Sequence, residues 1–146
     1  MTNTFQPYRK GTVLAPTGPC NHLHVICNDP VYYPINDCYC VLVVNISSIK
    51  DGVPHDPTCA LDVGDHPFVQ HPSYVVYAQA VIWRVDNVIR KEAAGEIMAH
   101  QDMPEATFSR ILNGFDISDD VSPKHLKFKN QHCVTNSIAN VPLTGS

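Results

Sequence analysis

Long apolar stretches are missing from this chain of 146 residues. The longest uninterrupted one, Cys38 to Val44, has the length of a single strand. A helix that crosses a bilayer needs about 18 or more apolar residues in a row, so the sequence predicts no membrane-spanning segment and no membrane partner. The first ten residues (MTNTFQPYRK) lack the apolar core of a signal peptide, and we expect a cytoplasmic protein.

Positive charge is absent from the middle of the chain. No Lys or Arg occurs between Lys50 and Arg84, where the only charged residues are aspartates, accompanied by three histidines. The formal net charge of -4 argues against a protein that binds nucleic acid by neutralising phosphates alone. Because the basic residues gather toward the two ends, an anionic ligand is expected to meet Arg9, Lys10 or Arg84.

Six cysteines would be enough for three disulfides in a secreted protein. Without an export signal we expect them to be reduced, and several lie in apolar segments where a thiol behaves as a small hydrophobic side chain. His22-Leu23-His24 and Cys38-Tyr39-Cys40 each place two potential metal ligands on one face of a strand. The closely paired cysteines of structural zinc sites are absent, so the sequence predicts neither a metal nor a cofactor.

Segments rich in β-branched, apolar and aromatic residues predict a strand-rich body. The segment 38–46, which is apolar from Cys38 to Val44, is expected to be buried on both faces, and 73–83 is predicted to be a second central strand. Shorter strands are predicted at 11–17 and 23–27. Residues 51–72 are rich in proline, histidine and aspartate and are expected to be irregular, with one weak strand at 59–62.

The apolar period changes beyond Trp83, and a helix is predicted over 103–113. Asp102 to Glu105 has the layout of a capping box, with a proline in the first turn. Gly114 stands at the position of a helix C-cap. Ser122-Pro123 is expected to begin a further short helix that runs to Phe128. The helix at 103–113 has a single apolar stripe formed by Phe108, Ile111, Leu112 and Phe115.

The order of these elements predicts an α+β domain that is mainly β, with a small curved sheet or barrel and a C-terminal packing helix. The length fits a single globular domain, which we place at residues 1–131. Residues 132–146 are polar and aperiodic, and we expect them to form a flexible C-terminal tail.

Several short stretches, in this order, resemble the MazF/PemK-like toxin family over residues 10–115. They are Gly11-Thr12-Val13, Val41 to Ser48 (VLVVNISS), Ser73-Tyr74-Val75, Arg84-Val85-Asp86, and Gly95-Glu96-Ile97 leading to Met103-Pro104-Glu105. The resemblance implies a homodimeric barrel of a toxin–antitoxin or mobile-element system, acting as a metal-independent endoribonuclease, with RNA and an antitoxin-like protein as partners. Ser47 or Ser48 matches the family's Ser/Thr position. Where the family has Arg-Pro at the start of the second strand, this chain has Asn21-His22-Leu23-His24.

Metal-free RNA cleavage needs a base for the 2′-hydroxyl proton, an acid for the leaving oxygen and positive charge at the phosphate. Histidine can fill either proton role near neutral pH. The segment 64–74 holds two His-Pro pairs, with Asp65 before the first and Ser73 after the second. The candidate catalytic residues are therefore His22, Ser47, Ser48, His66 and His71. The candidate binding residues are His55, Ser73, Tyr74, Arg84, Arg9 and Lys10.

Two other functions stay open from the sequence. One is a non-catalytic protein-binding module that keeps the barrel and contacts its partner through the 51–72 segment, which the net acidity of the chain favours. The other is a hydrolase that uses Ser73 as nucleophile and His71 or His66 as base. The RNA-cleavage hypothesis depends on whether His66, His71 and Ser47 converge in one cleft.

Overall fold

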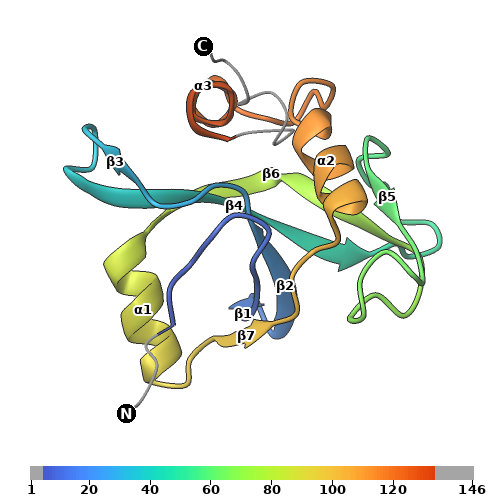
Figure 1. Cartoon of the computed structure of the whole chain (residues 1–146). Helices are drawn as coiled ribbons and strands as arrows, with labels where there is room; N and C mark the ends of the chain where they lie inside the picture. The colour runs from blue at the N-terminus through green and yellow to red at the C-terminus, as the bar shows by residue number, and fades with distance from the viewer. Residues whose placement is uncertain (1–4, 134–146) are drawn as a thin grey trace.

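A curled antiparallel sheet forms the body of the protein, which a computed structural model describes over residues 5–133 (Figure 1). The strands lie in the order β5-β6-β4-β2-β1-β7, and β3 pairs with the first residues of β4. The sheet bends into a half-barrel, so the predicted mainly β α+β architecture is confirmed. The strands are β1 (Thr12–Thr17), β2 (Cys20–Ile26), β3 (Val31–Tyr33), β4 (Cys38–Ser48), β5 (Ala60–Leu61), β6 (Ser73–Arg84) and β7 (Met98–His100).

Three helices pack on this sheet (Figure 1). The first, α1 (Val85–Ala93), follows β6 directly and covers one face. On the other face lie α2 (Glu105–Gly114) and α3 (Pro123–His132), so the predicted C-terminal packing helix is confirmed. No helix within residues 5–133 is long and apolar enough to cross a membrane.

The central strand β4 is apolar without interruption from Cys38 to Val44, because it contributes to two cores. Cys40, Leu42 and Val44 belong to the core beneath α2 and α3, whereas Val41 and Val43 belong to the core beneath α1. All five side chains are fully buried, so the predicted burial on both faces is confirmed for residues 40–46, whereas Tyr39 at the start of the strand is 57% exposed. Burying each such Val or Leu contributes about 1.5–3 kcal/mol, which makes β4 the main scaffold of the sheet.

All of the predicted strands are present, but three elements were not predicted. The helix α1 has an apolar stripe of three residues, Val85, Val88 and Ile89 at i, i+3 and i+4, but it is only nine residues long and follows β6 with no turn between them, so no boundary signal marks its start. The strands β3 and β7 have three residues each, too few for an alternating pattern to be visible. Residues 51–72 contain only the two-residue strand β5, which agrees with the mostly irregular segment that was predicted.

The helix α2 confirms the predicted helix and its buried apolar stripe but not its predicted caps. The capping box is wrong: Asp102 Oδ1 accepts a hydrogen bond from Tyr8 Oη at 2.6 Å, and the N-cap residue, Pro104, offers no side-chain cap. Gly114 is the last helical residue and not the C-cap. The C-cap is Phe115, in the right-handed helical conformation.

The helix α3 begins at Ser122-Pro123 as predicted and is longer than predicted. Ser122 is the N-cap, and its Oγ accepts a hydrogen bond from the backbone N–H of His125 at 3.3 Å. The helix continues to His132, and Cys133 is buried. The rest of the predicted tail, 134–146, lies outside the described residues.

All six cysteines are free thiols, and four of them are buried as small hydrophobic side chains. The Sγ atoms of Cys38 and Cys40 lie 3.7 Å apart at the start of β4. In the part of the chain that the structure describes, no group of three or more His, Cys, Asp or Glu side chains is arranged to hold a metal ion. The buried thiols are Cys27, Cys40, Cys59 and Cys133.

Candidate functional site

An open cleft lies where the ends of β2, β4 and β7 meet the loop that leads into β6. Its volume is about 470 Å³, within the range of about 300–1,000 Å³ that is usual for ligand sites. We call it the histidine cleft, because three imidazoles line it. The chemically active side chains in its lining are His22, His71, His100, Lys50, Ser47, Ser48 and Ser73.

Strand register brings these residues together from distant parts of the chain. Ser48 of β4 pairs with Ser73 of β6, and directly opposed residues of two strands have Cβ atoms about 4.5–5.5 Å apart. On the other side of β4, Leu23 pairs with Ile46. His22 and Ser47, one residue further along the two strands, therefore lie at the same end of the sheet.

The side chain of His71 lies next to Ser48 in the wall of the cleft. Its Nε2 lies 3.5 Å from Ser48 Oγ, at the outer limit of a hydrogen bond. The carbonyl of His71 accepts a hydrogen bond from Ser73 Oγ at 2.9 Å, which holds the loop against the start of β6. The imidazole is exposed and makes no further hydrogen bond within residues 5–133, so it is available for proton exchange with a ligand.

His22 carries an unpaired buried nitrogen. Its Nδ1 is the only buried side-chain nitrogen or oxygen within residues 5–133 that has no hydrogen-bond partner. Its carbonyl, in contrast, accepts a hydrogen bond from His24 Nδ1 at 2.8 Å. Buried polar atoms are almost always paired, so this exception is unusual. His22 also lines the cleft, which makes it a candidate for ligand binding.

His66 lies behind the wall of the cleft and not in it. Its side chain is only 2% exposed, Nε2 donates to the Gln101 carbonyl at 2.7 Å, and Nδ1 accepts from the Phe68 N–H at 3.0 Å. Burial lowers the pKa of His66, which keeps the ring neutral. Its centroid lies 5.3 Å from that of His100, which does line the cleft. His71 and Ser47 therefore both line the cleft, whereas His66 lies behind its wall, next to His100.

Two residues of the cleft were not anticipated from the sequence. His100 ends the short strand β7, and its Nδ1 accepts a hydrogen bond from the Gln101 N–H at 2.9 Å. No local pattern distinguishes it from any other exposed histidine. Lys50 is the only Lys or Arg in the lining. Its position in the sequence, shortly after Ser47 and Ser48 and just before the Asp51-Gly52 turn, is the one feature from which its place in the cleft could have been predicted.

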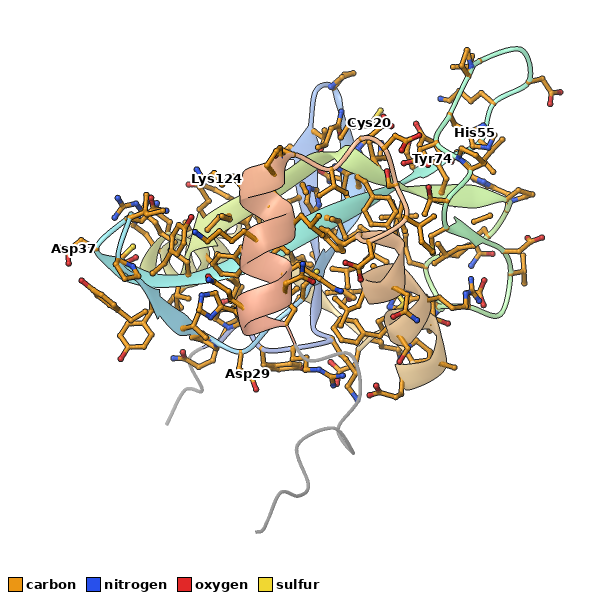
Figure 2. The ribbon with its side chains drawn as sticks, turned by 90° about the horizontal axis from the view of Figure 1, so that it is seen from above. Cys20, Asp29, Asp37, His55, Tyr74 and Lys124 are labelled. Atoms are coloured by element: carbon orange, nitrogen blue, oxygen red, sulfur yellow. The ribbon has the colours of Figure 1, made fainter. Side chains whose placement is uncertain are left out.

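His55 and Tyr74, two of the candidate binding residues, lie side by side outside the histidine cleft (Figure 2). Their ring centroids are 5.1 Å apart. They line a separate surface cavity that also contains Asp119 and Asp120. The two carboxylates make this cavity acidic, which is unfavourable for binding a phosphate. His55 and Tyr74 are not among the residues that line the histidine cleft.

Arg9 and Lys10 hold α2 and do not reach the cleft. Arg9 Nη2 lies 3.2 Å from Glu105 Oε2, and Lys10 Nζ lies 3.1 Å from Glu105 Oε1. The Arg9 guanidinium also stacks over the Phe108 ring at 4.6 Å. Hydrogen bonds from Arg9 and Lys10 hold the pKa of the Glu105 carboxyl below its ordinary value. The last candidate, Arg84, lines a different cavity.

The charges of the histidine cleft suit an anionic ligand. No Asp or Glu is among its lining residues, whereas Lys50 contributes a permanent positive charge. The three imidazoles can accept or donate protons, and the three serine hydroxyls can donate hydrogen bonds to ligand oxygens. These are the groups that cleavage of a phosphodiester without a metal requires.

No family model matches this chain. No curated protein is significantly similar to it in sequence.

Proposed function

We propose that this protein is a MazF/PemK-like, toxin-type endoribonuclease that cleaves RNA at the histidine cleft without a metal ion. The observation that carries the proposal is the gathering of His22, His71, Lys50 and Ser48 around one cleft that contains no carboxylate. The curled antiparallel half-barrel with a C-terminal helix supports it, because this is the kind of architecture that the sequence resemblance implies.

In the proposed reaction, the 2′-oxygen of a ribose attacks the adjacent phosphorus while the bond from phosphorus to the 5′-oxygen breaks. His71 takes the 2′-hydroxyl proton, since its ring is exposed beside Ser48. His22 gives a proton to the departing 5′-oxygen. The products are a 2′,3′-cyclic phosphate and a free 5′-hydroxyl, so the step balances without water or a cofactor.

The remaining side chains stabilise the charge that develops on the phosphate. Lys50 supplies the positive charge that the family's Arg would supply, from the end of β4 and not from β2. The hydroxyls of Ser47 and Ser48 donate hydrogen bonds to the non-bridging oxygens. Removing one such donor costs about 10²–10³-fold in rate in well-studied hydrolases.

The test is RNA cleavage by the purified chain in the presence of a metal chelator. We expect cleavage that leaves cyclic phosphate ends, and a loss of about 10²-fold or more in His71→Ala and in His22→Ala. His132→Gln is the matched control, because His132 ends α3 and does not line the cleft. Intact RNA after incubation with excess wild-type protein would refute the proposal, as would full activity of His71→Ala.

The proposal extends to the biological setting that the resemblance implies. Expression of the wild-type chain is expected to arrest bacterial growth, and His71→Ala is expected to relieve the arrest. An antitoxin-like partner and a homodimer belong to the same proposal. They are tested by co-expression of the neighbouring gene and by light scattering of the purified protein. Arrest that persists in His71→Ala would show a toxicity that does not come from the cleft.

A further inference from the structure

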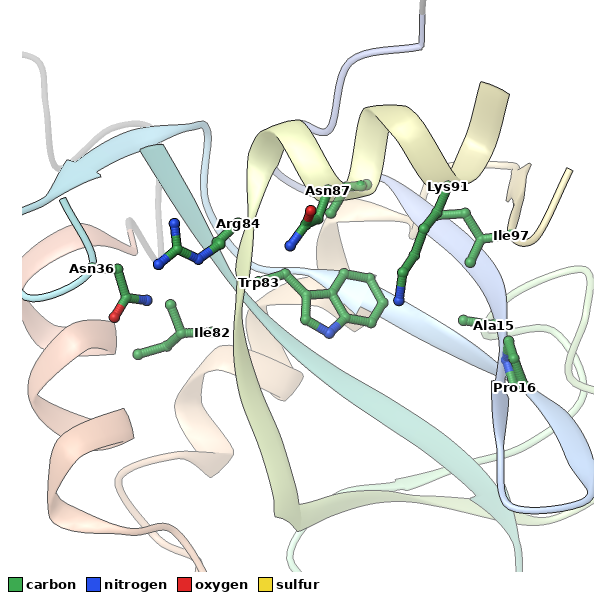
Figure 3. A pocket seen from close by; sticks show the side chains of 10 residues that line it. Ala15, Pro16, Asn36, Ile82, Trp83, Arg84, Asn87, Lys91 and Ile97 are labelled. Atoms are coloured by element: carbon green, nitrogen blue, oxygen red, sulfur yellow. The ribbon is translucent and has the colours of Figure 1, made fainter. Parts of the chain in front are cut away.

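A second cavity lies between α1, the end of β6 and β1 (Figure 3). We call it the tryptophan pocket, and its volume is about 370 Å³. Trp83 stands at its centre, and Lys91 descends from α1 beside the indole ring. Arg84 and Asn36 lie at one end, where Figure 3 shows their side chains near each other. The proposed cleavage reaction uses none of these residues.

The tryptophan pocket carries positive charge and no acidic side chain. Arg84 and Lys91 line it, and no Asp or Glu does. Within residues 5–133, neither cation forms a salt bridge, and Arg84 Nη1 contacts only the Cys38 sulfur, at 3.3 Å. In a chain with a net charge of -4, two cations without carboxylate partners in one cavity favour an anionic ligand.

Trp83 is held in place before any ligand arrives. The His24 ring stacks on it, with centroids 5.3 Å apart and an interplanar angle of 26°. His24 is itself fixed, because its Nδ1 donates to the His22 carbonyl at 2.8 Å and its Nε2 lies 3.4 Å from Thr17 Oγ1. A fixed aromatic surface in a cavity wall suits stacking with a planar ring, since little side-chain entropy is lost on binding.

Two amide side chains complete the pocket. Asn36 and Asn87 both line it, and each amide group can donate and accept hydrogen bonds. Asn87 Oδ1 accepts a hydrogen bond from Arg90 Nη2 at 2.9 Å, which orients its NH₂ group. Carboxamides pair with the polar edges of nucleobases, which present donors and acceptors side by side.

We propose that the tryptophan pocket binds a nucleotide, with the base against Trp83 and the amides and the phosphate on Arg84 and Lys91. The aromatic wall matches the face of the base, the two amides match its polar edge, and the two cations match the phosphate. The inference goes beyond the cleavage proposal, because nucleotide binding here requires no reaction in the histidine cleft. The two sites lie on one hairpin: Pro16 lines the pocket and pairs with Asn21, which lines the cleft.

Trp83 is the only tryptophan of the chain, so its fluorescence reports on the pocket directly. We expect saturable quenching by at least one of AMP, GMP, CMP and UMP, measured on the His71→Ala variant. For that base, the nucleoside without phosphate and ribose 5-phosphate without base are each expected to bind at least about tenfold more weakly. Lys91→Ala is expected to weaken nucleotide binding about tenfold.

Lys124→Ala is the matched control, because it removes one exposed lysine on α3 (Figure 2) and is expected to leave binding unchanged. Trp83→Leu is measured by equilibrium dialysis and is expected to weaken binding at least about fivefold. The absence of saturable quenching by all four nucleotides would overturn the inference. Equal affinity of His71→Ala and of the double variant His71→Ala/Lys91→Ala would overturn it as well.

The nucleotide has two possible sources, a free mononucleotide or one unit of an RNA strand, and a short oligoribonucleotide distinguishes them. Binding of the oligoribonucleotide at least tenfold tighter than the mononucleotide, and weakened by Lys91→Ala, assigns the pocket to a strand. Equal affinities assign it to the free nucleotide. Because the measurements use a cleavage-defective variant, loss of RNA cleavage and loss of nucleotide binding are separate results.

Discussion

Tyr77 and Gly114 approach each other so closely that position 114 has no room for a side chain. Tyr77 Oη donates a hydrogen bond of 2.6 Å to the carbonyl of Ile111, one of the carbonyls at the end of α2 that lack a partner within the helix. An ideal Cβ on Gly114 would lie 1.9 Å from Tyr77 Oη and 2.6 Å from its Cζ. Steric contact with a buried phenol, and not a left-handed cap, therefore explains this glycine.

Gly114→Ala is expected to lower the free energy of unfolding by about 2–3 kcal/mol. The added methyl group would force the buried Tyr77 ring away from Ile111, with the cost typical of overpacking in a core. Urea denaturation followed by circular dichroism measures the change.

The control for this prediction is Asn113→Ala, an exposed position in the same turn of α2, which is expected to change stability by less than about 0.5 kcal/mol. The double variant Tyr77→Phe/Gly114→Ala is expected to recover part of the loss, because it removes the nearest atom. A Gly114→Ala protein as stable as the wild type would contradict the contact.

Stability is expected to fall as the pH drops below about 6.5, and His66 contributes to the loss. Burial lowers the pKa of His66 in the folded protein from its ordinary value near 6.5. The unfolded chain therefore takes up a proton at a higher pH than the folded protein does. The contribution to stability is complete above the unfolded pKa and is lost as the pH falls through the folded pKa. His24 and His125 act in the same direction.

His66→Gln tests this origin, since an amide can still donate to the Gln101 carbonyl but does not titrate. The melting temperature of this variant is expected to decrease less between pH 7 and pH 5 than that of the wild type. The carboxyl groups with lowered pKa values titrate below this window, because their ordinary values are 3.8 and 4.5. The same pH dependence in both proteins would rule out a contribution from His66.

Ser48 is expected to position the His71 imidazole, since its Oγ lies 3.5 Å from His71 Nε2. Ser48→Ala should reduce kcat for RNA cleavage about 10²-fold or more with little change in KM, because it removes a hydrogen bond to the phosphate as well as the contact with His71. Ser48→Thr should restore most of the rate, because it keeps a hydroxyl. The ring-nitrogen NMR shifts of His71 provide a readout independent of cleavage. Unchanged shifts in Ser48→Ala would show that the two side chains do not interact.

Lys129 and Asp116 form a pair in which only the lysine is buried. Lys129 Nζ lies 2.6 Å from Asp116 Oδ2, and the side chains are 5% and 49% exposed. Asp116→Ala is expected to cost about 2 kcal/mol, because it leaves a buried ammonium with only Asn130 Oδ1 at 3.4 Å. Lys129→Met, which keeps the apolar stem, is expected to cost less. Urea denaturation of both variants measures the two losses. A larger loss of stability in Lys129→Met than in Asp116→Ala would contradict this account.

The strands and the main helix could be predicted because their signals are local. Residues 38–44 are continuously apolar, and β4 needs such residues because each of its faces meets a separate core. The apolar stripe of α2 repeats at the helical period and is buried along its length. The end residues of α2 could not be predicted, because the partners of Asp102 and Gly114 are Tyr8 and Tyr77, far away in the sequence.

The scaffold segments, and the histidines and serines that are candidates for chemistry, can be recognised from the amino-acid sequence. Which of these histidines and serines meet depends on long-range strand pairing, which is visible in the folded protein alone. Ser48 and His71, 23 residues apart, lie together because the end of β4 pairs with the start of β6, with Ser48 opposite Ser73. A change of one residue in this register would turn alternate side chains to the other face. His66 points into the protein although it lies in the same loop as His71, because Gln101 offers it a carbonyl. Long-range pairing of this kind leaves no trace in local composition or period.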